Sequence, residues 1–175
     1  MTKEIIAIWA EDEAGLIGVA GKLPWYLPKE LEHFKKTTLH QAILMGRVTF
    51  EGMNCKRLSQ RQTLVMTRNR DYQVDEVLTM TSIEKVLEWY HAQDKTLYII
   101  GGNKVLEAFN GYFDRIIKTV IHHRFKGDTY RPNLDFSHFT QESQTFYARD
   151  AKNPYDFTVT ALKHKYSEEM ISDAT

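Results

Sequence analysis

The amino-acid sequence predicts an α/β fold, with a mostly parallel central sheet of about eight strands and about four flanking helices. Two observations predict the parallel sheet. Short, nearly continuous apolar runs suit strands that are buried on both faces, and segments with helical periodicity separate these runs. In the C-terminal part, strand-like runs follow one another with only a short turn between them. That third observation predicts an antiparallel edge to the sheet.

Each expected element has a local reason in the sequence. Apolar runs predict buried strands at residues 5–10, 42–45, 63–66 and 97–100. Helical spacing predicts helices at 29–37, at 83–90 with Ser82 as the N-cap, and at 104–109. The antiparallel edge is expected to consist of strands at 115–123, 145–148 and 157–162. A turn around Pro154 separates the last two strands.

The composition is that of an ordinary globular domain. The 175 residues suit one domain, expected over 1–165, followed by a loosely held tail at 166–175. The formal net charge is zero, so neither nucleic acid nor an anionic membrane is expected as a partner. The longest apolar run is too short to span a bilayer, and the N-terminus lacks a signal-peptide pattern. We therefore expect a cytoplasmic monomer.

Neither a disulfide nor a metal site is expected. Cys55 is the single cysteine of the chain, which excludes an internal disulfide. The seven histidines form no i,i+4 pair and no Cys/His cluster. The sequence also lacks a nucleophile elbow and a Gly-x-x-x-x-Gly-Lys phosphate loop. The chemistry of the protein must therefore depend on other groups.

Glu30 is the first candidate functional residue. Pro28 fits the first turn of a helix, and Leu27, Leu31 and Phe34 recur at helical spacing after it, which predicts one apolar face. Glu30 borders that face, where a carboxylate is costly to desolvate unless a partner binds it. This position favours a role in binding a cationic or N–H-rich ligand. The simpler alternative is a solvated carboxylate at the edge of the face.

Three expected strand ends share a pattern that is typical of a phosphate site. They lead into glycine, threonine and arginine residues, namely Gly46, Arg47 and Thr49, then Thr67 and Arg68, then Gly101 and Gly102. In open α/β sheets, ligands bind where parallel strands end. Glycine allows close approach to a phosphate, and arginine supplies positive charge. The three ends together predict a site for a phosphorylated dinucleotide.

A glycine-rich loop follows the first expected strand. Gly15, Gly18 and Gly21 lie three residues apart and precede Leu23-Pro24-Trp25. Long loops in compact domains are often active-site lids, so a lid is the functional interpretation of this segment. An ordinary surface connection is the alternative.

The chain resembles the dihydrofolate reductase family over about residues 5–163. The similar segments keep the family's order and spacing, and they are Gly15-Leu-Ile-Gly18, Leu23-Pro24-Trp25, Leu27-Pro28, Glu30-Leu31, Phe34-Lys35, Thr38, Met45 to Glu51, Ile99-Ile100-Gly101-Gly102 and Gly127-Asp128-Thr129. The resemblance implies NADPH-dependent reduction of 7,8-dihydrofolate to tetrahydrofolate for one-carbon metabolism. It implies hydride transfer to pterin C6 with protonation of N5, and antifolate inhibitors as further ligands.

The resemblance also implies the residues of the substrate site. Catalytic roles fall on Glu30, Trp25, Leu23 and Thr119. Glu30 would accept hydrogen bonds from the pterin ring, Thr119 would bond to Glu30, and Arg61 would pair with the α-carboxylate of the substrate's glutamate. The residues implied to contact substrate are Ala10, Leu31, Phe34, Met53, Leu58, Arg61 and Ile100.

The cofactor site implied by the resemblance surrounds the three strand ends. Its residues are Ala10, Ile17, Gly18, Gly46, Arg47, Val48, Thr49, Thr67, Arg68, Ile100, Gly101, Gly102, Asn103, Val105 and Leu106. Arg47, Thr67 and Arg68 match the pocket for the adenosine 2′-phosphate, which is the reason to expect NADPH and not NADH. A cis peptide between Gly101 and Gly102 is also implied.

The sequence departs from the family pattern at several places. Glu30 replaces the aspartate of many bacterial members, Asn103 replaces a common third glycine, and Leu106 replaces a frequent aromatic residue. Segment 54–60 lacks the usual prolines, so the roles of its basic residues stay open. The alternatives are a related reductase of a riboflavin-pathway pyrimidine, a catalytically silent folate- or NADPH-binding protein, and a structural protein. The related reductase would lack the Glu30 helix with Phe34 and the arginine Arg61, whereas the silent binding protein would have lost Glu30 or the glycine pair.

Overall fold

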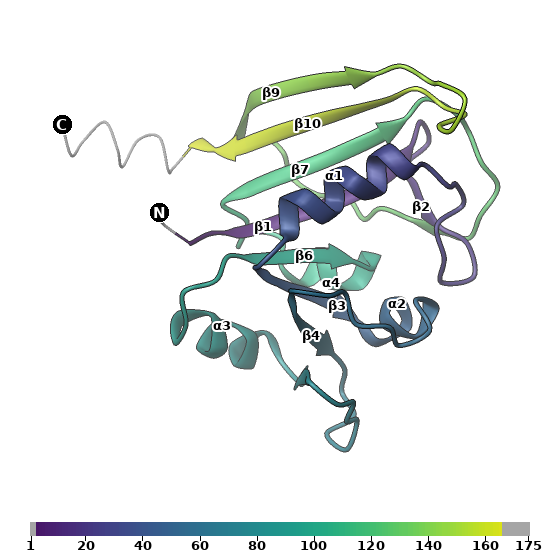
Figure 1. Ribbon diagram of the computed structural model, residues 1–175. Coiled ribbons are helices and arrows are strands. Elements are labelled where there is room, and N and C mark those ends of the chain that lie inside the picture. Colours follow the sequence, from purple (N-terminus) through teal and green to yellow (C-terminus); the bar gives the residue numbers. More distant parts are fainter. Residues whose placement is uncertain (1–2, 166–175) are drawn as a thin grey trace.

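The protein is built around one eight-stranded sheet (Figure 1). The computed structural model describes residues 3–165. The strands occur in the order β5-β4-β3-β6-β1-β7-β10-β9. Their bounds are β1 (Ile5–Asp12), β3 (Ala42–Gly46), β4 (Gln62–Met66), β5 (Val77–Met80), β6 (Leu97–Gly101), β7 (Arg115–Ile121), β9 (Phe139–Tyr147) and β10 (Phe157–His164). A second, small sheet pairs β2 (Leu16–Gly18) with β8 (Thr129–Tyr130).

The strand directions confirm the predicted fold class. Every pairing from β5 through β7 is parallel. The hairpin of β9 and β10 then joins β7 through antiparallel pairing of β10. Within residues 3–165, four helices accompany the sheet, namely α1 (Pro28–Thr38), α2 (Arg47–Gly52), α3 (Ile83–His91) and α4 (Asn103–Ala108). Ser82 caps α3 as predicted, because its side chain accepts a hydrogen bond from the Lys85 amide.

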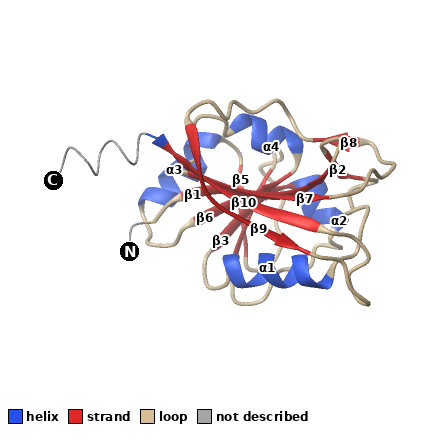
Figure 2. Cartoon of the chain, turned by 90° about the horizontal axis from the view of Figure 1, so that it is seen from above, coloured by secondary structure: helices blue, strands red, loops and turns tan. Residues whose placement is uncertain are grey.

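The helices cover both faces of the sheet. Figure 2 shows α1 on one side of the strands and α3 and α4 on the other. Strand β1 alternates between the two layers. Ile5, Ala7 and Trp9 pack in the cluster that includes Val86 of α3 and Leu106 of α4, whereas Ile6 and Ile8 pack in the cluster with Phe50 of α2. Burial on both faces explains why this strand is a nearly continuous apolar run.

The edges of the sheet differ from the sequence prediction. Strand β9 begins at Phe139, six residues before the expected start at 145. Six of its nine residues are exposed and the other three are only partly buried, so no apolar alternation marks it. Strand β5 was not predicted, because an edge strand of four residues carries too short a pattern. Strand β7 ends at Ile121, so His122 and His123 lie beyond it and not within a strand as expected.

Three short elements near the loops were also missed. The segment after Gly46, for which no helix was predicted, is the helix α2. A helix of six residues that buries Phe50 alone shows no periodicity in the sequence. Strands β2 and β8 are three and two residues long, which is too short to show a periodicity in the sequence.

Among residues 3–165, none of the helices combines the length and the apolar character that a membrane-spanning helix needs. The predicted tail at 166–175 lies outside the described residues.

Candidate active site

The carboxyl ends of the parallel strands bring the predicted cofactor residues together. Met45 of β3 is in register with Gly101 of β6, and Gly46 is in register with Met66 of β4. The chain therefore leaves three neighbouring strands at one edge of the sheet. Helices α2 and α4 begin at this edge, directly after Gly46 and Gly102.

Gly46 and Gly102 approach each other so closely that the strand exits form a cradle. A Cβ atom at Gly46 would lie 3.2 Å from Cγ2 of Val105 and 4.0 Å from the amide nitrogen of Gly102. A Cβ atom at Gly102 would lie 3.4 Å from Oγ1 of Thr49. The peptide between Gly101 and Gly102 is cis, as the resemblance implies. Because glycine has no Cβ atom, it allows the backbone at Gly46 and Gly102 to lie this close to neighbouring atoms.

The two helix starts at the cradle leave backbone N–H groups free of side-chain caps. Neither Gly46 nor Gly102 provides a capping side chain. Asn103 accepts a hydrogen bond from the Lys104 amide over 2.9 Å, so the residue that replaces a family glycine occupies one of these donors. The remaining N–H groups and the positive ends of the helices favour an anion.

Arginine side chains are available beside this cradle. Arg47 opens α2 and lies 4.0 Å from Glu51, with about half of its side chain exposed. Arg68 is exposed just after β4, and no ion pair of Arg68 occurs in residues 3–165. Thr67, between β4 and Arg68, bonds through Oγ1 to the Asn69 amide. These residues fit a phosphate at the edge of the cradle.

Glu30 is buried near the start of α1. Its side chain is 8% exposed. Burial raises the pKa of the carboxyl above its ordinary value, and a hydrogen bond from the Thr119 hydroxyl partly opposes this rise in pKa. Thr119 lies on β7, opposite Ala10 of β1, and is itself buried. The structure thus joins Glu30 and Thr119, as the resemblance implies.

The buried face of α1 differs from the sequence prediction. Leu27 is 1% exposed, but Leu31, which was expected on the same face, is 40% exposed. Glu30 and Thr38 are the buried residues of the helix, with Phe34 half-buried. Leu31 and Phe34 lie three residues apart within α1 and share one side of the helix, so the prediction fails on the burial of Leu31 and not on its helical position. Glu30 lies on the buried face itself and not at its border.

Trp25 adds a second buried polar group at the start of α1. Its indole packs against Phe125 with ring centroids 5.4 Å apart. Its Nε1 atom is buried and has no partner within residues 3–165. A buried donor without a partner is costly, so a water or a ligand that accepts from it is favoured.

The residues that the resemblance implies to contact substrate include partly buried apolar side chains and one arginine. Phe34, Met53, Leu58 and Ile100 are half-buried against one core cluster, and Leu23, Leu31 and Val48 are exposed although apolar. Arg61 is half-buried, and its guanidinium donates to the Ser59 carbonyl oxygen over 3.0 Å and to the Thr38 hydroxyl over 3.2 Å. Burial lowers the pKa of Arg61. No carboxylate of residues 3–165 pairs with it, so a carboxylate of a ligand is a suitable partner.

Two predicted cofactor residues take core positions. Leu106 is fully buried and Val105 is 9% exposed, both in the cluster beneath the sheet. Leu106 therefore presents no surface to a ligand in this conformation. Ile17 is partly buried against the same cluster, and Ala10 packs with Trp25 and Leu27.

The predicted lid, defined as residues 13–24, is attached near its middle to the loop before β8. Asp128 accepts a hydrogen bond from the Ala20 amide, and its own amide donates to the Gly18 carbonyl oxygen. A Cβ atom at Gly127 would lie 2.7 Å from the oxygen of Gly18, so the lid lies against the loop before β8. These contacts bring the Gly127-Asp128-Thr129 motif to the lid.

Sequence reasoning missed two buried carboxylates at the base of the lid. Asp12 accepts hydrogen bonds from the amides of Ala14, Leu16 and Phe125. Glu11 accepts from Nε1 of Trp9 and pairs with Arg131 over 3.1 Å. An aspartate just before a glycine turn is a sequence signal for the first. No sequence signal marks the Arg131 pair, because 120 residues separate its partners.

Comparisons with known proteins agree with this geometry. The family model described as dihydrofolate reductase matches residues 4–164. A dihydrofolate reductase of Lactococcus lactis is 51% identical over 158 residues, which cover 89% of this chain and 94% of that protein. A dihydrofolate reductase of Bacillus subtilis is 35% identical over 162 residues, which cover 93% of this chain and 95% of that protein.

A solved structure shows the same likeness in three dimensions. The dihydrofolate reductase from Enterococcus faecalis, complexed with NADP(H) and RAB-propyl, superposes with a TM-score of 0.90 at 39% sequence identity. The match covers 92% of this chain and 96% of that chain. The fold, the family model and the sequence relatives therefore all indicate the same family.

Proposed function

The chain belongs to the dihydrofolate reductase family, and from this premise we propose that Glu30, Thr119 and Trp25 carry its NADPH-dependent reduction of 7,8-dihydrofolate to tetrahydrofolate. The observation that supports these roles is the burial of Glu30. A carboxylate that is 8% exposed and bonded to one hydroxyl keeps unused acceptor sites. Buried polar groups of this kind are costly unless they serve a ligand.

Glu30 recognises and polarises the pterin ring. The ring presents an N–H and an amino group side by side, and a carboxylate accepts both hydrogen bonds at once. A negative charge held beside the ring favours the protonated pterin, which is the form that accepts a hydride. Thr119 holds the carboxylate in place. Trp25 Nε1 is a buried donor that orients a water beside the ring.

The residues of the cradle fit NADPH. Gly46 and Gly102 give the pyrophosphate close access to backbone N–H groups of α2 and α4. Arg47, Thr67 and Arg68 hold the 2′-phosphate. Bound NADPH supplies the hydride for pterin C6, and a solvent proton goes to N5. The protein contributes orientation, exclusion of water by the lid, and charge.

Arg61 and the apolar residues hold the rest of the substrate. The guanidinium of Arg61 is fixed by two hydrogen bonds and suits bidentate pairing with the α-carboxylate of the glutamate. Phe34, Met53, Leu58 and Leu31 provide apolar surface for the aromatic rings. We further propose that the protein acts as a cytoplasmic monomer, without a nucleic-acid or membrane partner, and that antifolate inhibitors compete with dihydrofolate.

The first experiment follows the loss of NADPH absorbance when purified protein is mixed with dihydrofolate, with NADH in a parallel reaction. Fast loss with NADPH and slow loss with NADH supports the assignment of Arg47, Thr67 and Arg68.

The same assay with the variant Glu30→Gln tests the role of the Glu30 carboxylate. We expect turnover at neutral pH to fall by about 100-fold or more, and less at low pH, where free dihydrofolate is partly protonated. Turnover equal to wild type at neutral pH would exclude this role of Glu30.

A further inference from the structure

Helix α1, which carries Glu30, starts without a cap from its own sequence. Leu27 occupies the N-cap position and offers no side-chain hydrogen bond. Pro28 follows and has no N–H group. The first backbone donor that needs a partner is therefore the amide of Lys29, one residue before Glu30. Helices usually satisfy such a donor with Ser, Thr, Asp or Asn at the N-cap.

The missing acceptor comes from the loop between β9 and β10. Oδ1 of Asn153 accepts a hydrogen bond from the Lys29 amide over 2.9 Å, although 124 residues separate the two in sequence. Asn153 is 4% exposed. A buried asparagine whose acceptor faces the start of α1 performs the task of an N-cap from another part of the chain.

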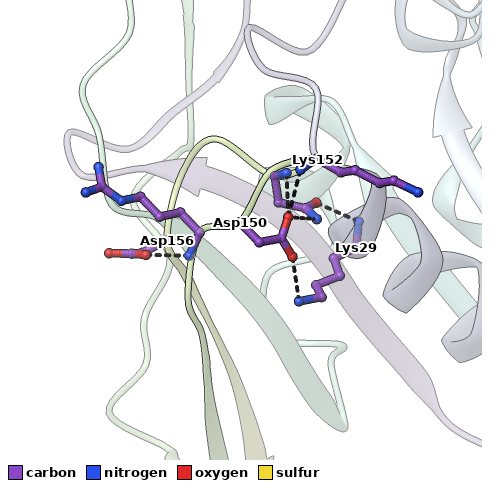
Figure 3. A network of polar contacts seen from close by, with 6 residues as sticks. Lys29, Asp150, Lys152 and Asp156 are labelled. Carbon is purple, nitrogen blue, oxygen red and sulfur yellow. Dashed lines mark hydrogen bonds and ion pairs between the residues drawn. The ribbon is translucent and has the colours of Figure 1, made fainter.

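Asp150 fixes the orientation of Asn153. Its Oδ1 atom accepts from Nδ2 and from the amide of Asn153, over 2.9 Å and 2.8 Å, and from the amide of Lys152 over 2.9 Å. Its Oδ2 atom pairs with Nζ of Lys29 over 2.9 Å. Figure 3 shows Asp150 between Lys29 and Lys152. Because Nδ2 must face the carboxylate, Oδ1 of Asn153 is left for the Lys29 amide.

These contacts also hold Asp150 in its charged form. The hydrogen bond from the Asn153 side chain, the bond from Lys29 and the backbone amides hold the pKa of Asp150 far below its ordinary value. The loop itself is closed by a hydrogen bond from the Arg149 amide to Asp156, which Figure 3 also shows. The cap is therefore presented by an ordered, charged loop.

The same hairpin leads directly to the partner of Glu30. Strand β10 begins at Phe157, and its Val159 is in register with Thr119 of β7. Thr119 donates to Glu30. The start of α1 is therefore attached twice to this part of the sheet, through Asn153 and through Thr119. Displacement of the first turn of α1 would therefore move Glu30 away from Thr119.

We propose that Asn153 and Asp150 are positioning residues for the reaction, which hold the first turn of α1 so that Glu30 stays in register with Thr119. The inference rests on the proposed role of Glu30. Both residues act through Glu30, and neither touches substrate or cofactor.

The test is a double-mutant cycle of Asn153→Ala and Glu30→Gln. We expect Asn153→Ala to lower kcat by about tenfold and to leave the KM for NADPH unchanged. In the Glu30→Gln background, assayed at the low pH where that variant retains turnover, Asn153→Ala should cause no further loss. A purely structural role would lower thermal stability but leave kcat unchanged, or lower kcat equally in both backgrounds. Either result would overturn the proposal.

Two further variants keep the test decisive if Asn153→Ala folds poorly. Asp150→Asn retains an acceptor for Asn153 and should keep most of the wild-type kcat, whereas Asp150→Ala should behave like Asn153→Ala. The matched control is Lys36→Ala, which breaks the exposed ion pair with Glu32 within the same helix and should leave kcat unchanged. If Asp150→Ala keeps the wild-type kcat, the positioning role is wrong. If Glu30→Gln itself keeps wild-type turnover, the proposed function of Glu30 is wrong. That result differs from failure of the positioning role alone, in which Glu30→Gln loses turnover but Asp150→Ala does not.

Discussion

The hydroxyl of Thr119 hydrogen-bonds the carboxylate of Glu30, and this bond acts against the burial that raises the pKa of the carboxyl. The two effects set how readily Glu30 ionises. Burial is the larger of them, so the folded protein retains a proton on Glu30 to higher pH than the unfolded chain does. The charged form of Glu30 therefore lowers the stability of the ligand-free fold, whereas the proposed reaction needs it. Both effects can be measured.

The first prediction concerns the stability of the ligand-free protein. Above the raised pKa, the buried carboxylate of Glu30 destabilises the fold, and this cost disappears as the pH falls through the folded pKa toward the ordinary value of 4.5. Glu30→Gln should raise Tm at neutral pH by about 2–4 °C. The difference between the two proteins should vanish near pH 4. Calorimetry across this pH range measures both, and an equal Tm difference at every pH would contradict the assignment.

The second prediction concerns Thr119. Thr119→Val removes the hydroxyl that lowers the pKa of Glu30 and keeps the shape of the side chain. The pKa of Glu30 should then rise further, so the acid limb of the kcat/KM profile should move to higher pH. Thr119→Ser retains the hydroxyl and is the control. A valine variant whose acid limb coincides with that of the serine variant would show that the bond does not tune Glu30.

The sequence predicted the interior of the fold better than its edges. Strand β1 was found because both of its faces are buried, which leaves a continuous apolar run. Strand β9 was found only in part, because most of its residues are exposed and its pairing with β10 leaves no trace in hydrophobicity. Helix α2 was missed because its six residues bury one side chain, Phe50.

The site was predictable where local sequence determines it and unpredictable where distant segments meet. Glu30 was found because a carboxylate within an apolar helix face is unusual. Leu31 was expected to be buried with Leu27 but is 40% exposed, because helical spacing predicts the face of a residue and not whether another element covers that face. The cap from Asn153 depends on two segments 124 residues apart, and no local pattern reports such a contact.

The third prediction tests the choice of cofactor. The double variant of Arg47→Ala and Arg68→Ala should weaken NADPH binding by about 100-fold and change NADH binding little, because the 2′-phosphate is the group lost between the two cofactors. Fluorescence titration gives both dissociation constants. Arg70→Ala is the matched control, since Arg70 is exposed and follows the same strand. Equal losses for both cofactors would refute the 2′-phosphate assignment.

The fourth prediction concerns the lid. A Cβ atom at Gly52 would lie 2.0 Å from the carbonyl oxygen of Gly21, closer than any real contact. Gly52→Ala must therefore displace the lid from α2, with a loss of about tenfold or more in kcat/KM for dihydrofolate. The exposed neighbour Glu51 provides the control Glu51→Ala. An alanine variant at Gly52 with unchanged kcat/KM would show that lid contact with α2 is not needed for reduction.

The fifth prediction concerns Arg61 and uses Arg57 as a matched control. Arg61 has no carboxylate partner in residues 3–165, whereas Arg57 pairs with Glu76 on the surface. Arg61→Lys keeps the charge but loses the planar fork that pairs with a carboxylate through two bonds. The KM for dihydrofolate should rise by about tenfold with kcat unchanged, because the interaction is made equally in the ground and transition states. Arg57→Lys should leave both constants at wild-type values. If the two lysine variants raise KM equally, the tail of the substrate lies between them, and Arg61 is not its specific partner.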